Sequence, residues 1–206
     1  MSTEQKVSEQ VLHITQQDTI INDMDVFNEL KRRVDLTRRS RIKASGRLRE
    51  KHEFFEKTSY FYSLVVLLLS IWFIDGEGNI TKILLISSLS LTFFTMFLGV
   101  KNYKERASNF ENNYQQLNVL LNKLQRLEAN PSLITQVKLK ELHRDYEKLI
   151  LEKENHISVD YMTCKPEHEK KYKMEILLYK FREGFKKYTL LFLPLILLMI
   201  FLYKSI

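Results

Sequence analysis

The sequence predicts an all-α membrane protein with a basic N-terminal helix, a two-helix transmembrane hairpin, a cytoplasmic antiparallel coiled-coil hairpin and a C-terminal apolar helix. Three observations support this class. Two long apolar runs flank a short polar turn, a cluster of basic residues precedes the first run, and two segments with heptad spacing follow the second. The mean hydropathy of -0.24 conceals these runs because strongly charged segments dilute them.

Composition narrows the possible functions. The chain has 206 residues and a formal net charge of +7, and most of the excess lies before the first apolar run. That placement favours a role in membrane topology over a general nucleic-acid surface, so we expect no nucleic-acid partner. Cys164 is the only cysteine, which excludes an intramolecular disulfide. The N-terminus has no basic region followed by an apolar stretch, so we expect no cleaved signal peptide.

The N-terminal part of the chain separates into a leader and a helix. Residues 1–24 are rich in Gln, Ser and Thr, and we expect them to form a flexible leader. Residues 25–57 are predicted to form a basic amphipathic helix, because Phe27, Leu30 and Val34 follow helical spacing. The helix is predicted to continue into the first membrane span.

Six basic residues of this helix follow one another without an intervening acid: Arg38, Arg39, Arg41, Lys43, Arg47 and Arg49. One interpretation is the positive-inside rule, by which they hold this side of the first span in the cytoplasm. A second is contact with anionic lipid head groups or a partner protein, since each basic residue near an anionic surface contributes about 1 kcal/mol. Nucleic-acid binding is a third interpretation, which no aromatic interleaving supports.

Residues 58–100 are predicted to cross the membrane twice. From Ile83 to Val100 the chain has no charged residue, and about 18 helical residues at about 1.5 Å each nearly match the hydrocarbon thickness. The segment Asp75–Asn79 between the spans has two acids and two glycines, which suits a tight turn. Basic residues follow the second span, so we expect a multi-pass protein of the inner membrane with a cytoplasmic N-terminus.

Small polar residues share one face of each predicted span. The first span has Ser63 and Ser70 on such a face, together with Ser59. The second span has Thr81, Ser88, Thr92, Thr95 and Gly99. Two interpretations stay open: close packing of helices through small residues, or the lining of an aqueous pore. A pore of this kind has no ring of charge, so we would expect weak ion selectivity.

Residues 101–165 are predicted to form a cytoplasmic helical hairpin. One heptad seam consists of Phe110, Tyr114, Leu117, Leu121 and Leu124, and the returning arm carries Leu139, Leu142, Tyr146 and Leu149. Asn130 is predicted to cap the returning helix, with Pro131 as its first residue. The pattern is typical of an antiparallel coiled coil, and it leaves open whether the seams meet within one chain or between chains.

The segment Glu152–Glu169 is the one region that resembles a chemical site. His156, Asp160, Cys164 and His168 recur every four residues, and these residue types ligate zinc. Such steps drift around a straight helix, and Pro166 interrupts it before His168, so we expect no metal and no cofactor. His156 and Asp160 also form an H-x-x-x-D pair, seen in some acyltransferases. We favour a polar junction in which these two side chains bond across one helical turn, and we expect no enzyme activity.

The last segment, residues 166–206, is predicted to be a helix that leads into a third apolar run, Tyr188–Tyr203. Apart from Thr189 next to its first residue, this run has no Ser, Thr or Gly, and Pro194 is its only proline. Its roughly 16 residues are short for a span, although tyrosines and lysines at its ends can compensate. We expect a lipid-facing anchor, which either spans the bilayer or lies shallowly in it.

In this order, the pieces resemble the SLATT family, the two-transmembrane effector proteins of bacterial conflict systems. The resemblance covers about residues 26 to 162 and is carried by DLTRRSRIKASGRLREKHEFFEK before the first span, NYKERASNFENNYQQLNVLLNKL after the hairpin, and ENHISVDY. It implies a pore-forming or membrane-disrupting effector in antiphage defence, paired with a sensor or an enzyme of nucleotide signalling.

The leading hypothesis is therefore a homo-oligomer that contacts membrane lipids and permeabilises the inner membrane when a partner protein or nucleotide signal triggers it. The alternative is a membrane-anchored scaffold that recruits a partner through its basic helix and coiled coil, without conduction. A membrane enzyme that uses His156 and Asp160 is the third hypothesis.

Overall fold

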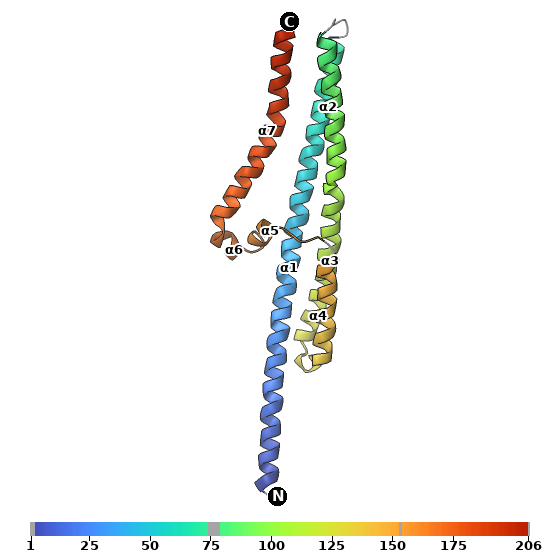
Figure 1. Ribbon diagram of the computed structural model, residues 1–206. Helices are drawn as coiled ribbons and strands as arrows, with labels where there is room; N and C mark the ends of the chain where they lie inside the picture. The colour runs from blue at the N-terminus through green and yellow to red at the C-terminus, as the bar shows by residue number, and fades with distance from the viewer. Residues whose placement is uncertain (1–2, 74–78, 153, 206) are drawn as a thin grey trace. The chain divides into compact units, whose positions relative to one another are not determined.

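The computed structural model describes residues 3–73, 79–152 and 154–205, and it describes side-chain environments from residue 23 onward, apart from residue 79 and several near the C-terminus. Every element in these ranges is helical, as the predicted all-α class requires (Figure 1). In chain order the elements are α1 (Thr3–Trp72), α2 (Asn79–Lys101), α3 (Tyr103–Glu128), η1 (Pro131–Leu133), α4 (Gln136–Leu151), α5 (Ser158–Met162), α6 (Pro166–Lys171) and α7 (Lys173–Ser205).

The chain forms two compact units. The bundle unit comprises Met1–Lys43 and Asn109–Lys165, and the hairpin unit comprises Ala44–Ser108 and Pro166–Ile206. Helices α1 and α3 each contribute one part to the bundle unit and the other part to the hairpin unit.

Helix α1 is a single element from Thr3 to Trp72 (Figure 1). Helix α1 includes residues from Thr3 onward, ahead of the helix start predicted at Asp25, while the flexible leader over residues 1–24 stays a prediction. The physical reason is composition, because residues 3–45 contain neither glycine nor proline and nothing in them breaks a helix. The predicted continuation into the first span is observed.

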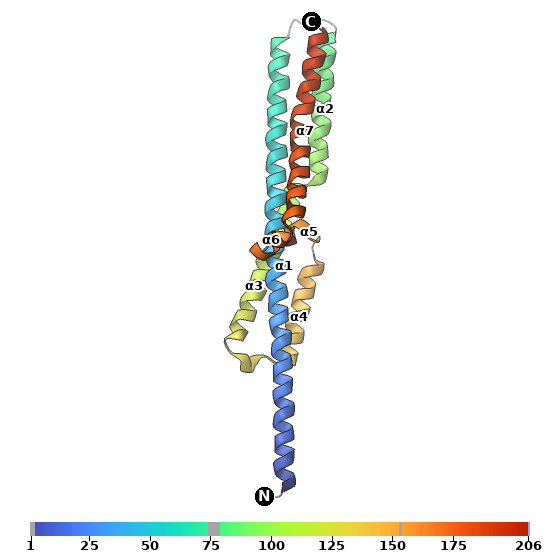
Figure 2. The ribbon, with the colours of Figure 1, turned by 90° about the vertical axis from the view of Figure 1, so that its left-hand side faces the viewer.

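A shared apolar core of α1, α3 and α4 holds the bundle unit together. Its buried members are Phe27, Leu30, Val34, Leu117, Leu120, Leu121, Leu124, Leu139, Leu142 and Tyr146. Figures 1 and 2 show α3 and α4 running beside the first part of α1. The two predicted heptad seams therefore meet within one chain, and α1 joins them because its own apolar stripe needs a partner.

The connection between α3 and α4 corrects one prediction. Asn130 makes no side-chain capping hydrogen bond, and Pro131 begins the short 3₁₀ helix η1 instead of α4. The cap of α4 is Thr135, whose hydroxyl accepts a hydrogen bond from the Lys138 backbone N–H at 3.3 Å. Pro131 interrupts the helix, as predicted. The chain then forms the short helix η1 before α4 begins at Gln136.

The hairpin unit contains the second part of α1 together with α2, α6 and α7. Asn102 separates α2 from α3 and has a φ of 45°, a left-handed conformation that asparagine tolerates better than most residues. Figure 2 shows α7 running alongside α1 and α2. Lys51 of α1 forms an ion pair with Glu183 of α7, and the Lys187 ammonium lies 5.2 Å from the centre of the Phe54 ring.

Helix α7 carries a proline within its length. The predicted single helix from Pro166 is divided at Tyr172, whose N–H still donates to the His168 carbonyl at 2.9 Å. Pro194 has no N–H, so it leaves the carbonyl of Leu190 without its helical donor. The single hydroxyl hydrogen of Tyr62 in α1 is shared between that carbonyl, at 3.2 Å, and the nearer carbonyl of Leu191.

By length and composition, two stretches of the described residues could cross a membrane: Asp23–Trp72 and Ile80–Glu128. The large side chains of α2 are mostly exposed; Leu85 is 68% exposed and Phe93 is 64% exposed. Apolar side chains exposed to this extent need apolar surroundings outside the chain, as a bilayer provides. The predicted turn at residues 75–78 lies outside the described residues.

Candidate functional site

The small polar stripe of α2 lies on a face that this chain leaves exposed. Its members Thr81, Ser88, Thr92, Thr95 and Gly99 are all exposed, and a Cβ added at Gly99 would meet no atom within 4 Å. The face that is partly covered by the rest of the chain carries Ile83, Ser87, Leu91, Phe94 and Leu98. At about 100° per residue, the centres of the two faces are about 110° apart. Packing within one chain therefore uses a different face of α2.

The hydroxyl groups of this stripe bond to their own helix. Ser88 Oγ donates to the Leu85 carbonyl at 2.9 Å, Thr92 Oγ1 to the Ser88 carbonyl at 3.0 Å, and Thr95 Oγ1 to the Thr92 carbonyl at 2.8 Å. No donor in these three side chains is therefore left to lipid, while each oxygen can still accept a hydrogen bond. The stripe is compatible both with a bilayer and with water.

The serines of the first span behave in the same way. Ser63 Oγ donates to the Ser59 carbonyl at 2.9 Å, and Ser70 Oγ donates to the Val66 carbonyl at 2.7 Å. Both Ser63 and Ser70 are exposed, whereas Ser59 is buried.

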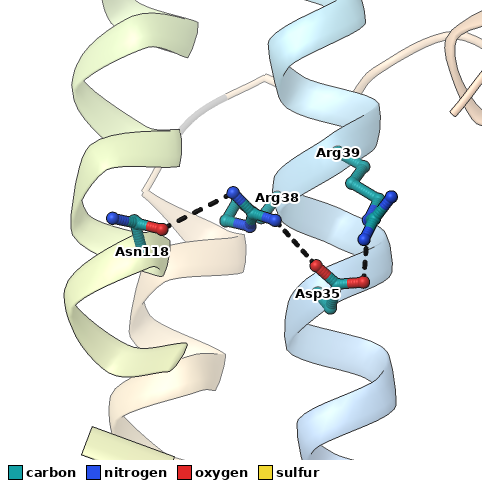
Figure 3. Close-up of polar contacts among 4 residues, drawn as sticks. All are labelled: Asp35, Arg38, Arg39 and Asn118. Carbon is teal, nitrogen blue, oxygen red and sulfur yellow. Dashed lines mark hydrogen bonds and ion pairs between the residues drawn. The ribbon is translucent and has the colours of Figure 1, made fainter. Parts of the chain in front are cut away.

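Two of the six predicted basic residues pair with an acid one turn earlier. Asp35 accepts hydrogen bonds from Arg38 and Arg39, each at 2.8 Å, and Arg38 also reaches Asn118 of α3 at 3.5 Å (Figure 3). Partial burial raises the pKa of Asp35, but the bonds from Arg38 and then Arg39 outweigh it, so its pKa lies below the ordinary value. Arg38 thus connects α1 to α3, whereas Arg39 bonds within α1.

A polar hollow of about 440 Å³ lies in the same region of the bundle unit. It is lined by Asn28, Lys31, Arg32, Asp35, Arg38, Arg39, Leu121 and Gln125. Lys31 pairs with Glu128 at 2.5 Å, and Arg32 pairs with Glu29 at 2.8 Å. Four basic side chains thus line one hollow, and each of them is paired with an acidic side chain of the same unit.

Arg41 is fully buried in the bundle unit. Its two terminal nitrogens lie 3.4 Å from the carbonyl oxygens of Ile150 and Glu154, and its guanidinium lies 5.7 Å from the centre of the Phe110 ring. Asn113, also fully buried, donates to the carbonyl of Leu149 at 2.8 Å. A cation and an amide thus occupy the C-terminal end of α4, where the carbonyls have no helical donors. Burial lowers the pKa of Arg41.

The remaining three basic residues lie farther along α1. Lys43 and Arg49 are exposed, and Arg47 is half-buried. The six basic residues therefore differ in exposure: Arg41 is enclosed, whereas Lys43 and Arg49 reach the surface. Contact of the exposed residues with lipid or a partner stays a prediction.

The predicted polar junction of His156 and Asp160 lies at the start of α5. Asp160 is buried and accepts the Ile157 backbone N–H at 3.1 Å, which caps α5. Within the described residues, Nδ1 of the half-buried His156 has no hydrogen-bond partner. Burial lowers the pKa of His156, the charge of Arg41 lowers it further, and Asp160 opposes both effects. His156 is therefore held in its neutral form beside a buried cation.

The structure does not assemble the four residues that could have bound zinc. Among the residues that the structure describes, no group of three or more His, Cys, Asp or Glu side chains could hold a metal ion. Cys164 is 7% exposed, and burial raises the pKa of its thiol. A buried neutral thiol is a poor ligand and a poor nucleophile.

Sequence reasoning missed two important side chains, Arg41 as a buried cap and Tyr62 as the donor to α7. Arg41 stands in a run of basic residues, and only the spacing of Val34, Arg41 and Leu48 on one side of α1 could have indicated its burial. The signal for Tyr62 was Pro194, because a proline inside an apolar helix requires an outside donor for the freed carbonyl.

Comparison with known families gives one match. The family model described as SMODS and SLOG-associating 2TM effector domain family 5 matches residues 24–204. Searches of curated proteins and of solved structures find no match. The matched range includes the basic part of α1, the hairpin, the bundle helices and nearly all of α7.

Proposed function

Because the chain belongs to the SMODS and SLOG-associating 2TM effector domain family 5, we propose that it is a membrane effector that oligomerises and permeabilises the bacterial inner membrane when triggered. Family membership and the two long apolar helices make it a membrane protein with a two-transmembrane effector domain of conflict systems. Pore formation, the inner membrane and a cytoplasmic N-terminus are parts of our proposal.

The observation that carries this proposal is the exposure of the polar stripe on α2. Ser88, Thr92 and Thr95 face away from the packed side of the helix, and each has already bonded its hydroxyl hydrogen within α2. When several copies assemble, such stripes can face one another and surround a water-filled path without leaving any donor unpaired. In the absence of assembly, the same stripes tolerate lipid.

The trigger would act by a shift of population between a closed and an open assembly. The matched family's description names association with SMODS and SLOG, and a partner or a nucleotide signal is our proposed trigger.

The scaffold alternative receives less support from the contacts. It depends on the basic helix as a docking surface, yet Arg38 and Arg39 pair with Asp35, and Arg41 is enclosed. Our proposal assigns no catalytic step to His156 or Asp160, since the Asp160 carboxylate caps α5.

The test is membrane depolarisation in bacteria, followed with a potential-sensitive dye after induction of the chain. The variant in which Ser88, Thr92 and Thr95 are all changed to leucine removes the hydroxyls, and we expect it to insert normally but to lose depolarisation. A matched control with Thr92→Ser and Thr95→Ser retains a hydroxyl at each position and should still depolarise. Equal depolarisation by the wild type and the leucine variant, at matched membrane levels, would remove the stripe from the mechanism.

A further inference from the structure

The hairpin unit contains a half-open cavity of about 480 Å³ between α1, α2 and α7. Its walls include Val65 of α1, Ile86 and Leu91 of α2, and Leu195 and Leu198 of α7. The volume lies within the range of ordinary ligand sites, about 300–1,000 Å³. The cavity is distinct from the polar stripe, which lies on another face of α2.

Two polar side chains at the cavity wall, those of Tyr62 and Ser87, are committed to backbone groups, and the small hydroxyl side chain of Ser90 also lines it. The Tyr62 hydroxyl shares its one hydrogen between the carbonyls of Leu190 and Leu191, and Ser87 Oγ donates to the carbonyl of Ile83 at 2.8 Å. The rest of the wall is almost entirely aliphatic or aromatic. A cavity with such walls stays dry and accepts an apolar molecule, because water or a polar ligand would lose hydrogen bonds there.

Aromatic contacts continue from one end of this cavity. Phe94, which lines it, contacts Phe55 with ring centres 6.4 Å apart, and Phe55 stacks on Tyr103 at 5.6 Å. Lys187 lies over the neighbouring ring of Phe54. Aromatic rings with lysines are typical of the boundary between membrane and water. The cavity therefore lies on the hydrocarbon side of that boundary, where a ligand arrives from the bilayer.

Pro194 and Tyr62 both line the cavity. Proline weakens the helical hydrogen bonding of α7 at the cavity wall, and the Tyr62 side chain bonds to the freed carbonyl across the gap between α1 and α7. Tyr62 thus links α1 to α7 near Leu190, and the cavity lies beside this hydrogen bond.

From these observations we infer that the cavity binds one acyl chain of a membrane phospholipid, held between α7 and the transmembrane hairpin. The chain is bound by its hydrocarbon, since the side chains of Tyr62 and Ser87 are already committed to backbone groups. Binding of this kind does not require conduction, so it is independent of the proposed pore. It assigns α7 a function besides anchoring, because α7 supplies one wall of the lipid site.

The experiment uses the full chain in vesicles of phosphatidylcholine and phosphatidylglycerol that contain a phosphatidylcholine with a diazirine on its acyl chain. Excess unlabelled lipid is added before irradiation, and the labelled residues are mapped by mass spectrometry. We expect label at Leu91 and Leu195 to persist through the chase, whereas label at Phe93 and Met199, on exposed faces, is lost. Equal loss at both pairs would overturn the inference.

A variant that fills the cavity gives an independent check. Ser87→Phe places a ring in the cavity, and the retained label at Leu91 and Leu195 should be lost. The matched control is Leu89→Phe, which adds a ring at an exposed position of the same helix and should keep the retained label. Persistence of the label in a correctly inserted Ser87→Phe protein would contradict the inference. If that variant fails to insert, the wild-type chase alone decides the question, and depolarisation measured in parallel reports separately on the pore.

Discussion

The two units of this protein use the same element, a long helix with apolar side chains, in opposite ways. In the bundle unit, Leu30, Leu117 and Leu142 are at most 2% exposed. In the hairpin unit, Leu85 and Phe93 of α2 are more than half exposed. The bundle unit supplies its own apolar surroundings, whereas the hairpin unit depends on lipid or on other copies of the chain.

Polar groups show the same difference. Arg41 and Asn113 of the bundle unit reach across to carbonyls in the last turn of α4 and, for Arg41, also in the segment after it, so they fix which helices pack together. In the hairpin unit, Ser88 and Thr92 bond to their own helix, so they do not fix the position of a neighbour. The buried polar groups of the bundle unit therefore specify their neighbours, whereas the exposed hydroxyls of α2 specify none.

The largest effect is expected from a substitution in the core of the bundle unit. Leu117→Ala removes a fully buried side chain and should lower the free energy of unfolding by about 2–5 kcal/mol. Cys164 is the only cysteine and is buried in the same unit, so its reaction with a thiol reagent reports opening. We expect labelling of the full chain in detergent to become at least about 30-fold faster. The control Leu89→Ala, on the exposed face of α2, should leave the rate unchanged, and an equal acceleration would contradict the comparison.

The second effect tests the buried arginine. Arg41→Met leaves the carbonyls of Ile150 and Glu154 without their donors, which should cost about 1–3 kcal/mol in the same labelling assay. Arg39→Met removes an exposed partner of Asp35 and should cost at most about 1 kcal/mol. If both variants have the same effect, Arg41 is not a specific cap of α4.

The third effect sharpens the description of the hairpin unit. Tyr62→Phe removes the donor to the carbonyl freed by Pro194 and should cost about 0.6–1.7 kcal/mol, the range for hydrogen bonds between membrane helices. In a Pro194→Leu background that carbonyl regains its helical donor, so Tyr62→Phe should cost less. Titration with a denaturing detergent, followed by circular dichroism, measures all four proteins of this cycle. Additive effects would show that Tyr62 and Pro194 are not coupled.

The smallest expected effect is a pH dependence of the bundle unit. The pKa of His156 is lowered below 6.5 in the folded state, mainly by burial and then by Arg41. Below pH 6.5 the unfolded chain therefore binds more protons, so this contribution to stability is complete above pH 6.5 and is lost as pH falls through the lowered pKa. His156→Gln should flatten the pH dependence of Cys164 labelling below pH 6.5, after correction for the reagent's own pH dependence. An unchanged slope would exclude His156 as its source.

Several features of the fold were predictable because they depend on local pattern. The absence of charge from Ile83 to Val100 predicted a membrane helix, and the spacing of Leu117, Leu121 and Leu124 predicted a buried seam. The polar stripe was also predicted, since helical geometry alone puts its members on one face. Family membership, inferred from short polar segments, agrees with the matched family model.

Only the tertiary structure decided which partner each face meets. Periodicity defines a face but not its neighbour, so the third helix of the bundle core could not be read from the two seams. The same limit applies to Arg41, because a run of basic residues looks uniformly solvated until one member is enclosed by α3 and α4. It applies equally to Tyr62 and Pro194, which are more than a hundred residues apart and meet only when α7 packs against α1. Such pairings depend on long-range packing, for which a single sequence carries no local signal.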